Sequence, residues 1–224
     1  MFKCESFSAR NQRKRKFCTS SWIFGDDHCE CSYKHAKYHW RATHSRKYTI
    51  IGDSLIKNIK QLRFTEVQAF PGANTNTLYR KLGRSDDVQL DFDIVVVAIG
   101  TNDIENRIIS PERHAQEISE VIRLILRENP ACKLGISEIV PRLCDSDELN
   151  RRVIEFNRAV KQICKHFRKD ENRKVWYLST SARFLKNGTL ISNLFERDGL
   201  HLSCRGQQVL QEILVGHIKR LQGY

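Results

Sequence analysis

Residues 93–100 read Asp-Ile-Val-Val-Val-Ala-Ile-Gly, and this stretch decides the fold class. Its consecutive apolar, mostly β-branched residues show no alternation with polar ones. A strand with this pattern is buried on both faces, which is typical of a central strand in a parallel sheet. Gly100 follows and ends the run.

Further strand and helix patterns alternate on both sides of this stretch. The other predicted strands are short apolar runs at 48–51, 64–70, 132–140 and 174–178. The predicted helices, whose apolar residues recur at helical spacing, are 55–62, 77–82, one that starts at Ser110-Pro111, 147–167 and 204–221. We expect a loop at 179–202. The alternation predicts an α/β fold with a parallel sheet, whose functional site lies outside the carboxyl ends of the strands.

Charge divides the chain into two parts. The 224 residues carry a net charge of +12, and residues 1–47 alone contain 11 Lys and Arg against 4 Asp and Glu. The composition changes near Lys47, which predicts a flexible basic arm at 1–46 and an α/β domain at 47–224. A basic arm favours RNA or DNA, because binding releases counterions from the polyanion. The alternative is a solvated leader without a ligand.

The arm also contains a group of Cys and His residues. Cys29, Cys31, His35 and His39 have the spacing C-x-C-x3-H-x3-H. These residue types bind zinc, but structural zinc sites usually begin with two to four residues between the cysteines. The four residues are therefore weak zinc candidates. The alternative is an arm whose thiols have no ligand.

The sequence shows no apolar run that predicts a signal peptide or a membrane-spanning helix. The stretch from Met1 to Lys16 has no apolar run of about 7–15 residues, as a signal peptide requires. The longest apolar run, Ile94 to Ile99, is too short to span a bilayer. We expect a soluble intracellular protein, cytoplasmic or nuclear, with free thiols in the body of the chain. The oligomeric state does not follow from the sequence.

Two polar segments follow the first two predicted strands. Ser54, within Gly52-Asp53-Ser54-Leu55, comes where a strand turns into a helix, so the positive end of the helix dipole would favour an alkoxide. The alternative for Ser54 is a helix N-cap without chemistry. Gly72 follows the second strand and can present its backbone N–H to a substrate. The alternative is a simple turn glycine.

Two more segments complete a set of residues suited to acyl transfer. Asn102 follows the central strand, and its side chain can donate a hydrogen bond to a developing oxyanion, or make a local turn instead. Asp198 precedes His201 by three residues, so its carboxylate can bind Nδ1 and leave Nε2 free to accept a proton. The alternative is an exposed histidine without a role. With Ser54 and Gly72, these residues fill every role that acyl transfer needs.

The four segments resemble the conserved blocks of the SGNH/GDSL hydrolases, in the same order along the chain. Gly52-Asp53-Ser54-Leu55 matches the first block, Gly72 the second, Gly100-Thr101-Asn102-Asp103 the third, and Asp198 with His201 the last. The resemblance covers about residues 48–221. It implies a three-layer α/β/α sandwich with a five-stranded parallel sheet.

The same resemblance implies a role for each matching residue. Ser54 would be the nucleophile, His201 the base and Asp198 the residue that orients the base. The oxyanion hole would consist of the Ser54 N–H, the Gly72 N–H and the Asn102 side chain. Members of the family are esterases, lipases, thioesterases and acetylesterases that need no metal, so we expect no cofactor and a small-molecule or lipid ester as substrate.

A narrower likeness concerns the wording around these blocks. Esterase-like domains of animal transposable elements, some of them in the first reading frame of LINE-type retrotransposons, are similar to this chain at 51–54, 70–75, 198–202, Pro141-Arg142 and Asn157. The α/β-hydrolase pattern Gly-x-Ser-x-Gly fits less well, because Ile56 occupies the place of its second glycine.

Two functions follow from the sequence. The leading one is serine-dependent hydrolysis of carboxylic esters, acyl or acetyl, through a Ser-His-Asp triad. The alternative is a catalytically weak or inactive scaffold of the same fold that binds nucleic acid through its basic N-terminal arm.

Overall fold

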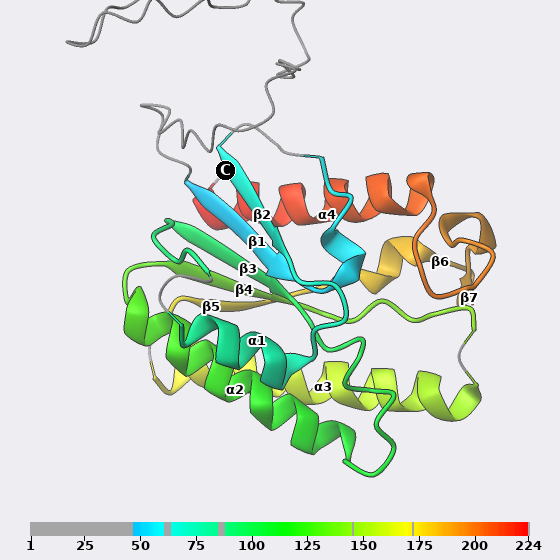
Figure 1. The fold of residues 1–224 in the computed structure, drawn as a ribbon, viewed down its shortest axis with the longest axis horizontal. Helices are drawn as coiled ribbons and strands as arrows, with labels where there is room; N and C mark the ends of the chain where they lie inside the picture. The colour runs from blue at the N-terminus through cyan, green and yellow to red at the C-terminus, as the bar shows by residue number, and fades with distance from the viewer. Residues whose placement is uncertain (1–46, 61–63, 85–87, 145, 172, 224) are drawn as a thin grey trace, which may run out of the picture. The chain divides into compact units, whose positions relative to one another are not determined.

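A computed structural model describes residues 47–60, 64–84, 88–144, 146–171 and 173–223. The basic arm at 1–46, with the zinc candidates Cys29, Cys31, His35 and His39, lies outside these residues. The described part contains alternating strands and helices, as the sequence predicts (Figure 1).

Five parallel strands form the main sheet, in the order β2-β1-β3-β4-β5. Their bounds are β1 Tyr48–Gly52, β2 Thr65–Ala69, β3 Ile94–Ala98, β4 Lys133–Ser137 and β5 Val175–Leu178. The strand β3 occupies the middle of the sheet and pairs in parallel with β1 and β4. The prediction of a central strand at 93–99 is therefore confirmed.

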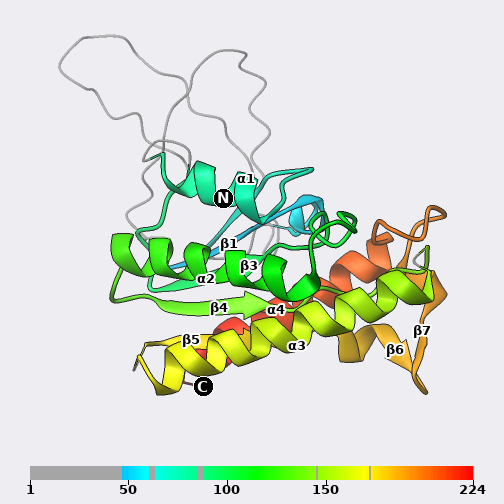
Figure 2. The ribbon, with the colours of Figure 1, turned by 90° about the horizontal axis from the view of Figure 1, so that it is seen from below.

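Helices cover both faces of the sheet and make a three-layer sandwich (Figures 1 and 2). The helices α1 (Thr75–Leu82), α2 (Pro111–Glu128) and α3 (Asp147–Lys169) lie on one face, and α4 (Cys204–Gln222) lies on the other. The side chains of β3 alternate between two cores: Val95 and Val97 pack in the first, Ile94 and Val96 in the second. The α/β/α sandwich with a five-stranded parallel sheet is confirmed.

The helices α1, α2, α3 and α4 each begin at a side-chain cap. Ser110, Ser146 and Ser203 accept hydrogen bonds from backbone N–H groups three residues later, at the starts of α2, α3 and α4. Asn74 does the same for α1. Such caps stabilise a helix by about 1 kcal/mol each, and here they fix where each helix starts after a strand end.

The helix predicted at 55–62 is wrong for the part that the structure describes. Only a 3-10 helix, η1, forms at Ser54–Ile56. The backbone N–H groups of Ile56, Lys57 and Ile59 each bind a carbonyl three residues earlier, so the segment is a series of tight turns. Ile56 and Ile59 are nevertheless buried in the second core, which explains their apolar character without a helix.

The predicted loop at 179–202 contains short ordered elements. They are the 3-10 helix η2 (Ser181–Phe184), the hairpin strands β6 (Leu185–Lys186) and β7 (Thr189–Leu190), and the 3-10 helix η3 (Ser192–Leu194). Phe184, Leu194 and Phe195 are buried in the second core. These aromatic and aliphatic residues therefore belong to the core. Within the described residues, no helix has the length and apolar character of a membrane span.

Candidate active site

The first and third blocks meet where β1 and β3 end side by side. Gly52 pairs with Ala98, and a Cβ atom on Gly52 would lie 2.0 Å from the Ala98 carbonyl oxygen. Only glycine fits this contact. The Asp53 N–H donates to the same oxygen at 3.3 Å, so the turn that carries Ser54 is held against the end of the central strand.

Ser54 is half-buried at the start of η1, directly after the sheet. The residue that caps this turn is Asp53, whose Oδ1 accepts from the Leu55 N–H at 2.9 Å. The expectation of a helix dipole behind Ser54 needs correction, because η1 has only three residues. A dipole of one turn is small, so it would contribute little to activating a hydroxyl at this position.

Asp53 is the buried carboxyl next to the serine. Burial raises its pKa to about 6, although hydrogen bonds from the Leu55 N–H and the Thr101 hydroxyl lower it. A cavity of about 20 Å³ borders Asp53, Thr101 and Glu138, and it has room for about one water molecule.

The expected oxyanion donors lie on the loops after β2 and β3. Gly72 has a φ of +76° in an exposed turn, and no atom lies within 4 Å of where its Cβ would be, so the backbone there is open to a substrate. The Asn102 side chain donates from Nδ2 to the Ala73 carbonyl at 2.7 Å. This bond joins the loop of Asn102 to the loop of Gly72, which brings together two of the predicted site residues.

Asp103 strengthens the same connection, a role that the sequence did not reveal. Its two carboxylate oxygens lie 3.1 and 3.0 Å from the backbone N of Thr75, the first residue of α1. Burial raises the pKa of Asp103, whereas the hydrogen bonds from Thr75 lower it.

Among the described residues, one group could hold a metal ion, and it consists of Asp103, His114 and Glu117.

Asp198 and His201 form the hydrogen-bonded pair that their spacing predicts. Asp198 Oδ2 lies 2.6 Å from His201 Nδ1, and Asp198 Oδ1 accepts from the backbone N–H groups of Leu200 and His201, each at 2.9 Å. The hydrogen bonds from His201 and Leu200 lower the pKa of Asp198 to about 2. The carboxylate is therefore ionised throughout the neutral range and can orient an imidazole.

The loop that carries this pair is anchored to the segment after β4. The N–H groups of Leu143 and Cys144 lie 2.9 and 3.4 Å from the Gly199 carbonyl oxygen, and the Glu196 N–H donates to the His201 carbonyl. Gly199 has a φ of +68°, which favours glycine.

Two residues quoted for the narrower likeness brace neighbouring loops. Asn157 on α3 accepts from the N–H of Ile139 and donates to its carbonyl, both at 2.9 Å. Arg142 is buried and its Nη1 lies 2.8 Å from Glu105 Oε1 on the loop after β3. The bonds join positions 18 and 37 residues apart, so no local pattern in the sequence could have assigned these partners.

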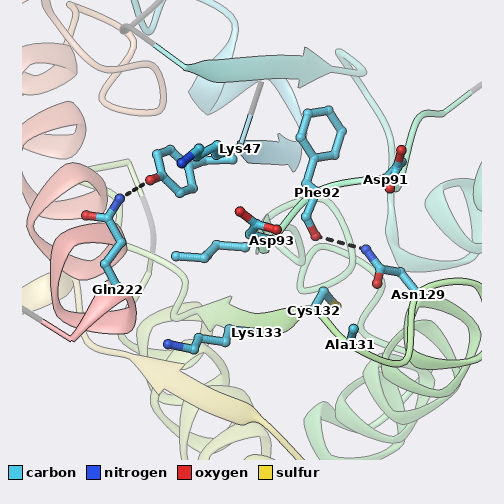
Figure 3. Close-up of a pocket in the computed structure, with 11 residues that line it drawn as sticks. Lys47, Asp91, Phe92, Asp93, Asn129, Ala131, Cys132, Lys133 and Gln222 are labelled. Atoms are coloured by element: carbon cyan, nitrogen blue, oxygen red, sulfur yellow. Dashed lines mark hydrogen bonds between the residues drawn. The ribbon is translucent and has the colours of Figure 1, made fainter. Parts of the chain in front are cut away.

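A larger cavity lies at the opposite, amino ends of the strands (Figure 3). Its volume is about 670 Å³, and its lining includes Lys47, Asp93 and Lys133, which precede or begin β1, β3 and β4. Asn129 donates to the Phe92 carbonyl at its edge. Of the residues that the sequence predicts for the site, none of those that the structure describes lines this cavity. The candidate active site therefore lies at the carboxyl ends of the strands.

Solved structures of similar fold are numerous. A protein from Streptococcus pneumonia has 19% identity and a TM-score of 0.66, over 80% of this chain and 86% of that one. A carbohydrate esterase of family 3 from Talaromyces cellulolyticus has 14% identity and a TM-score of 0.62, over 80% and 99%. A GDSL-like lipase from Bacteroides thetaiotaomicron has 13% identity and a TM-score of 0.61, over 78% and 88%. At these identities the likeness establishes the fold.

Sequence comparison identifies the family. No curated protein matches the chain. The profile of the GDSL-like lipase/acylhydrolase family matches residues 24–209, which is most of the chain and includes every block at the strand ends. The protein therefore belongs to the GDSL-like lipase/acylhydrolase family.

Proposed function

We propose that this protein hydrolyses carboxylic esters, with Ser54 as the nucleophile, His201 as the base and Asp198 as the residue that orients the base. The observation that carries the proposal is the Asp198–His201 pair, in which a 2.6 Å hydrogen bond occupies Nδ1. A neutral imidazole with a proton on Nδ1 has its lone pair on Nε2, where it can accept the serine proton.

The reaction follows from these roles. Ser54 Oγ attacks the ester carbonyl carbon while its proton moves to His201 Nε2, and the carbonyl oxygen becomes an oxyanion. The C–O bond to the alcohol then breaks, and His201 returns the proton to the departing alkoxide. A water molecule, deprotonated by His201, attacks the acyl-serine, and Ser54 leaves with that proton to release the carboxylic acid.

The oxyanion would be held by three N–H donors. They are the backbone N–H groups of Ser54 and Gly72 and the side chain of Asn102. An amide nitrogen carries two hydrogens, and the bond from Asn102 to Ala73 uses one of them. The second hydrogen is the donor in this proposal, and the bond to Ala73 fixes the plane of the amide before substrate binds.

The proposed substrates include esters of short acyl groups. One solved structure of similar fold is that of an acetyl esterase with an acetate ion, and this likeness supports acetyl esters as substrates.

The test is turnover of p-nitrophenyl esters of increasing acyl length by the wild type, Ser54→Ala and Ser192→Ala. Ser192 is an exposed serine in η3 and serves as the matched control. We expect Ser54→Ala to lose at least about 10³-fold in kcat with an unchanged unfolding midpoint, because the nucleophile is absent. Wild-type turnover in Ser54→Ala would overturn the mechanism.

A second candidate function is nucleic-acid binding through the basic arm, on a scaffold with weak or no turnover. It is favoured by the 11 basic and 4 acidic residues among the first 47. The test measures the salt dependence of RNA binding by the wild type and by a variant in which Arg13, Lys14, Arg15 and Lys16 are replaced by glutamine. If these residues contact single-stranded RNA, the slope of log K against log salt should become shallower by about 3, since each contact contributes about 0.7. An unchanged slope would exclude this run from the binding surface.

A further inference from the structure

A buried group of three potential metal ligands lies beside the oxyanion loops. Asp103 is on the loop after β3, and His114 and Glu117 are on the first turns of α2. Their nearest ligand atoms all lie within 4.8 Å of one another. His114 Nδ1 is 3.8 Å from Asp103 Oδ1 and 3.7 Å from Glu117 Oε2. Both distances are too long for a hydrogen bond.

His114 is the unexplained member of this group. Its side chain is only 5% exposed, and neither ring nitrogen has a hydrogen-bond partner among the described residues. Buried polar atoms are nearly always paired, because leaving them unpaired destabilises the folded state. The Nδ1 atom nevertheless faces two carboxylate oxygens at almost equal distances. A cation between the three atoms would satisfy Nδ1 and both acids.

We propose that Asp103, His114 and Glu117 bind one divalent ion of the zinc class. Zinc bonds to imidazole nitrogen and carboxylate oxygen are about 2.0–2.2 Å long, so two ligand atoms of one ion lie at most about 4.4 Å apart. The separations of 3.8 and 3.7 Å fall within this limit. An imidazole ligand favours zinc, cobalt or nickel over magnesium and calcium. Two carboxylates neutralise the charge of the ion.

The local structure supports such a site in three further ways. His114 and Glu117 are three residues apart on α2, so their side chains share one face of the helix. The Asp103 carboxylate also accepts from the Thr75 N–H, an outer contact of the kind that orients metal ligands. The Glu117 side chain is 30% exposed and gives the ion access from solvent.

The ion would act as a structural link and would take no part in the ester chemistry. It would join the loop after β3 to α2, and Asp103 would extend the link to the start of α1. Asn102, the neighbour of Asp103, lies within this linked region and contacts Ala73 on the adjacent loop. Zinc binding should therefore stabilise the folded protein, because only the folded chain assembles the three ligands.

The experiment measures zinc in the full chain after chelator dialysis and re-equilibration with zinc. All samples carry Cys4→Ser, Cys18→Ser, Cys29→Ser and Cys31→Ser, which removes the four thiols of the arm. Glu117→Gln removes one ligand from a partly exposed position, and Glu120→Gln, an exposed acid of the same helix, is the matched control. Bound zinc is counted by elemental mass spectrometry, and the unfolding midpoint is recorded with and without zinc.

We expect Glu117→Gln to hold one zinc ion fewer per chain than Glu120→Gln. We also expect the zinc-dependent rise of the midpoint to be smaller in Glu117→Gln and in His114→Asn than in the control. Equal zinc content and equal midpoint shifts in Glu117→Gln and Glu120→Gln would overturn the site. Neither readout involves ester turnover, so failure here leaves the proposed hydrolysis untouched.

Discussion

The carboxylate of Asp198 holds His201 at two points, by its ring and by its backbone. Oδ2 lies 2.6 Å from Nδ1, while Oδ1 accepts from the backbone N–H of the same residue at 2.9 Å. The bond to the backbone N–H fixes the position of the His201 main chain, and the bond to Nδ1 fixes the orientation of its ring. One side chain thereby sets both the position and the tautomer of the imidazole.

Replacement of Asp198 by asparagine separates these two effects. In Asp198→Asn, the amide oxygen can still accept from the backbone, but the amide N–H₂ meets Nδ1 and favours the tautomer with its proton on Nε2. That tautomer cannot accept the proton of Ser54. We expect kcat to fall by roughly 10³–10⁴-fold with little change in KM, measured on a p-nitrophenyl ester. A loss smaller than tenfold would contradict the orienting role of Asp198.

Truncation of Asn102 tests the proposed oxyanion hole. In Asn102→Ala, we expect kcat to fall by about 10²–10³-fold, because one N–H donor to the transition state is lost. The exposed Asn76 on α1 provides a matched Asn→Ala control, which should keep wild-type turnover. If Asn102→Ala changed KM alone, the side chain would bind the ground state rather than the oxyanion.

Two glycines with positive φ differ in what surrounds them. Gly72 and Gly199 have φ values of +76° and +68°. Alanine at 72 meets no atom within 4 Å, whereas a Cβ at 199 would lie 2.9 Å from the Cys144 backbone N. Gly72→Ala should cost about 1–2 kcal/mol of unfolding free energy from backbone strain alone. Gly199→Ala should lower the unfolding free energy by more than Gly72→Ala does. Equal losses, measured by urea denaturation, would show that the backbone at Cys144 can move away from the new Cβ at no energetic cost.

Asp53 predicts a pH dependence of stability in a defined window. Its pKa is about 6 in the folded protein, whereas 3.8 is the ordinary value of an aspartate and applies to the unfolded chain. The folded state therefore binds the proton more tightly, so this residue makes stability fall as the pH rises from about 4 to 6. A shift of this size corresponds to about 3 kcal/mol at most.

The matched measurement compares Asp53→Asn with Asp91→Asn, an exposed aspartate. Asparagine at 53 keeps an oxygen for the Leu55 N–H but does not ionise. Relative to wild type, Asp53→Asn should therefore gain stability toward neutral pH, whereas Asp91→Asn should follow the wild-type curve. Parallel curves for wild type and Asp53→Asn between pH 4 and 7 would show that burial does not raise this pKa.

The layers and the strand-end blocks could be predicted because their signals are local. The apolar run at 94–99 has no polar face, so only a buried central position suits it. Ser110-Pro111 marks the start of α2, and the structure places a capping serine and a first-turn proline there. Asp198 and His201 are three residues apart, so their bond is also a local event.

Other contacts depend on which segments the fold brings together. Asp103 binds Thr75 across 28 residues, and Asn157 binds Ile139 across 18. No periodicity marks these pairs. The helix predicted at 55–62 was wrong for a different reason. Ile56 and Ile59 have helical spacing, but a series of tight turns, not an α-helix, places both side chains in the second core. The likeness to transposable-element esterases and the roles of residues 1–46 stay predictions.

The position of Asp198 and His201 on one four-residue loop has a consequence for how activity can be lost. Because Gly199 ties this loop to the backbone of Leu143 and Cys144, the acid and the base move together whenever the loop after β4 moves. The Asp198–His201 hydrogen bond, and with it the tautomer of the imidazole, is then kept even when the loop has moved so far that Nε2 no longer reaches Ser54. In the proposed mechanism, a change that moves the loop after β4 can therefore abolish turnover while Ser54, Asp198 and His201 are all present in the chain.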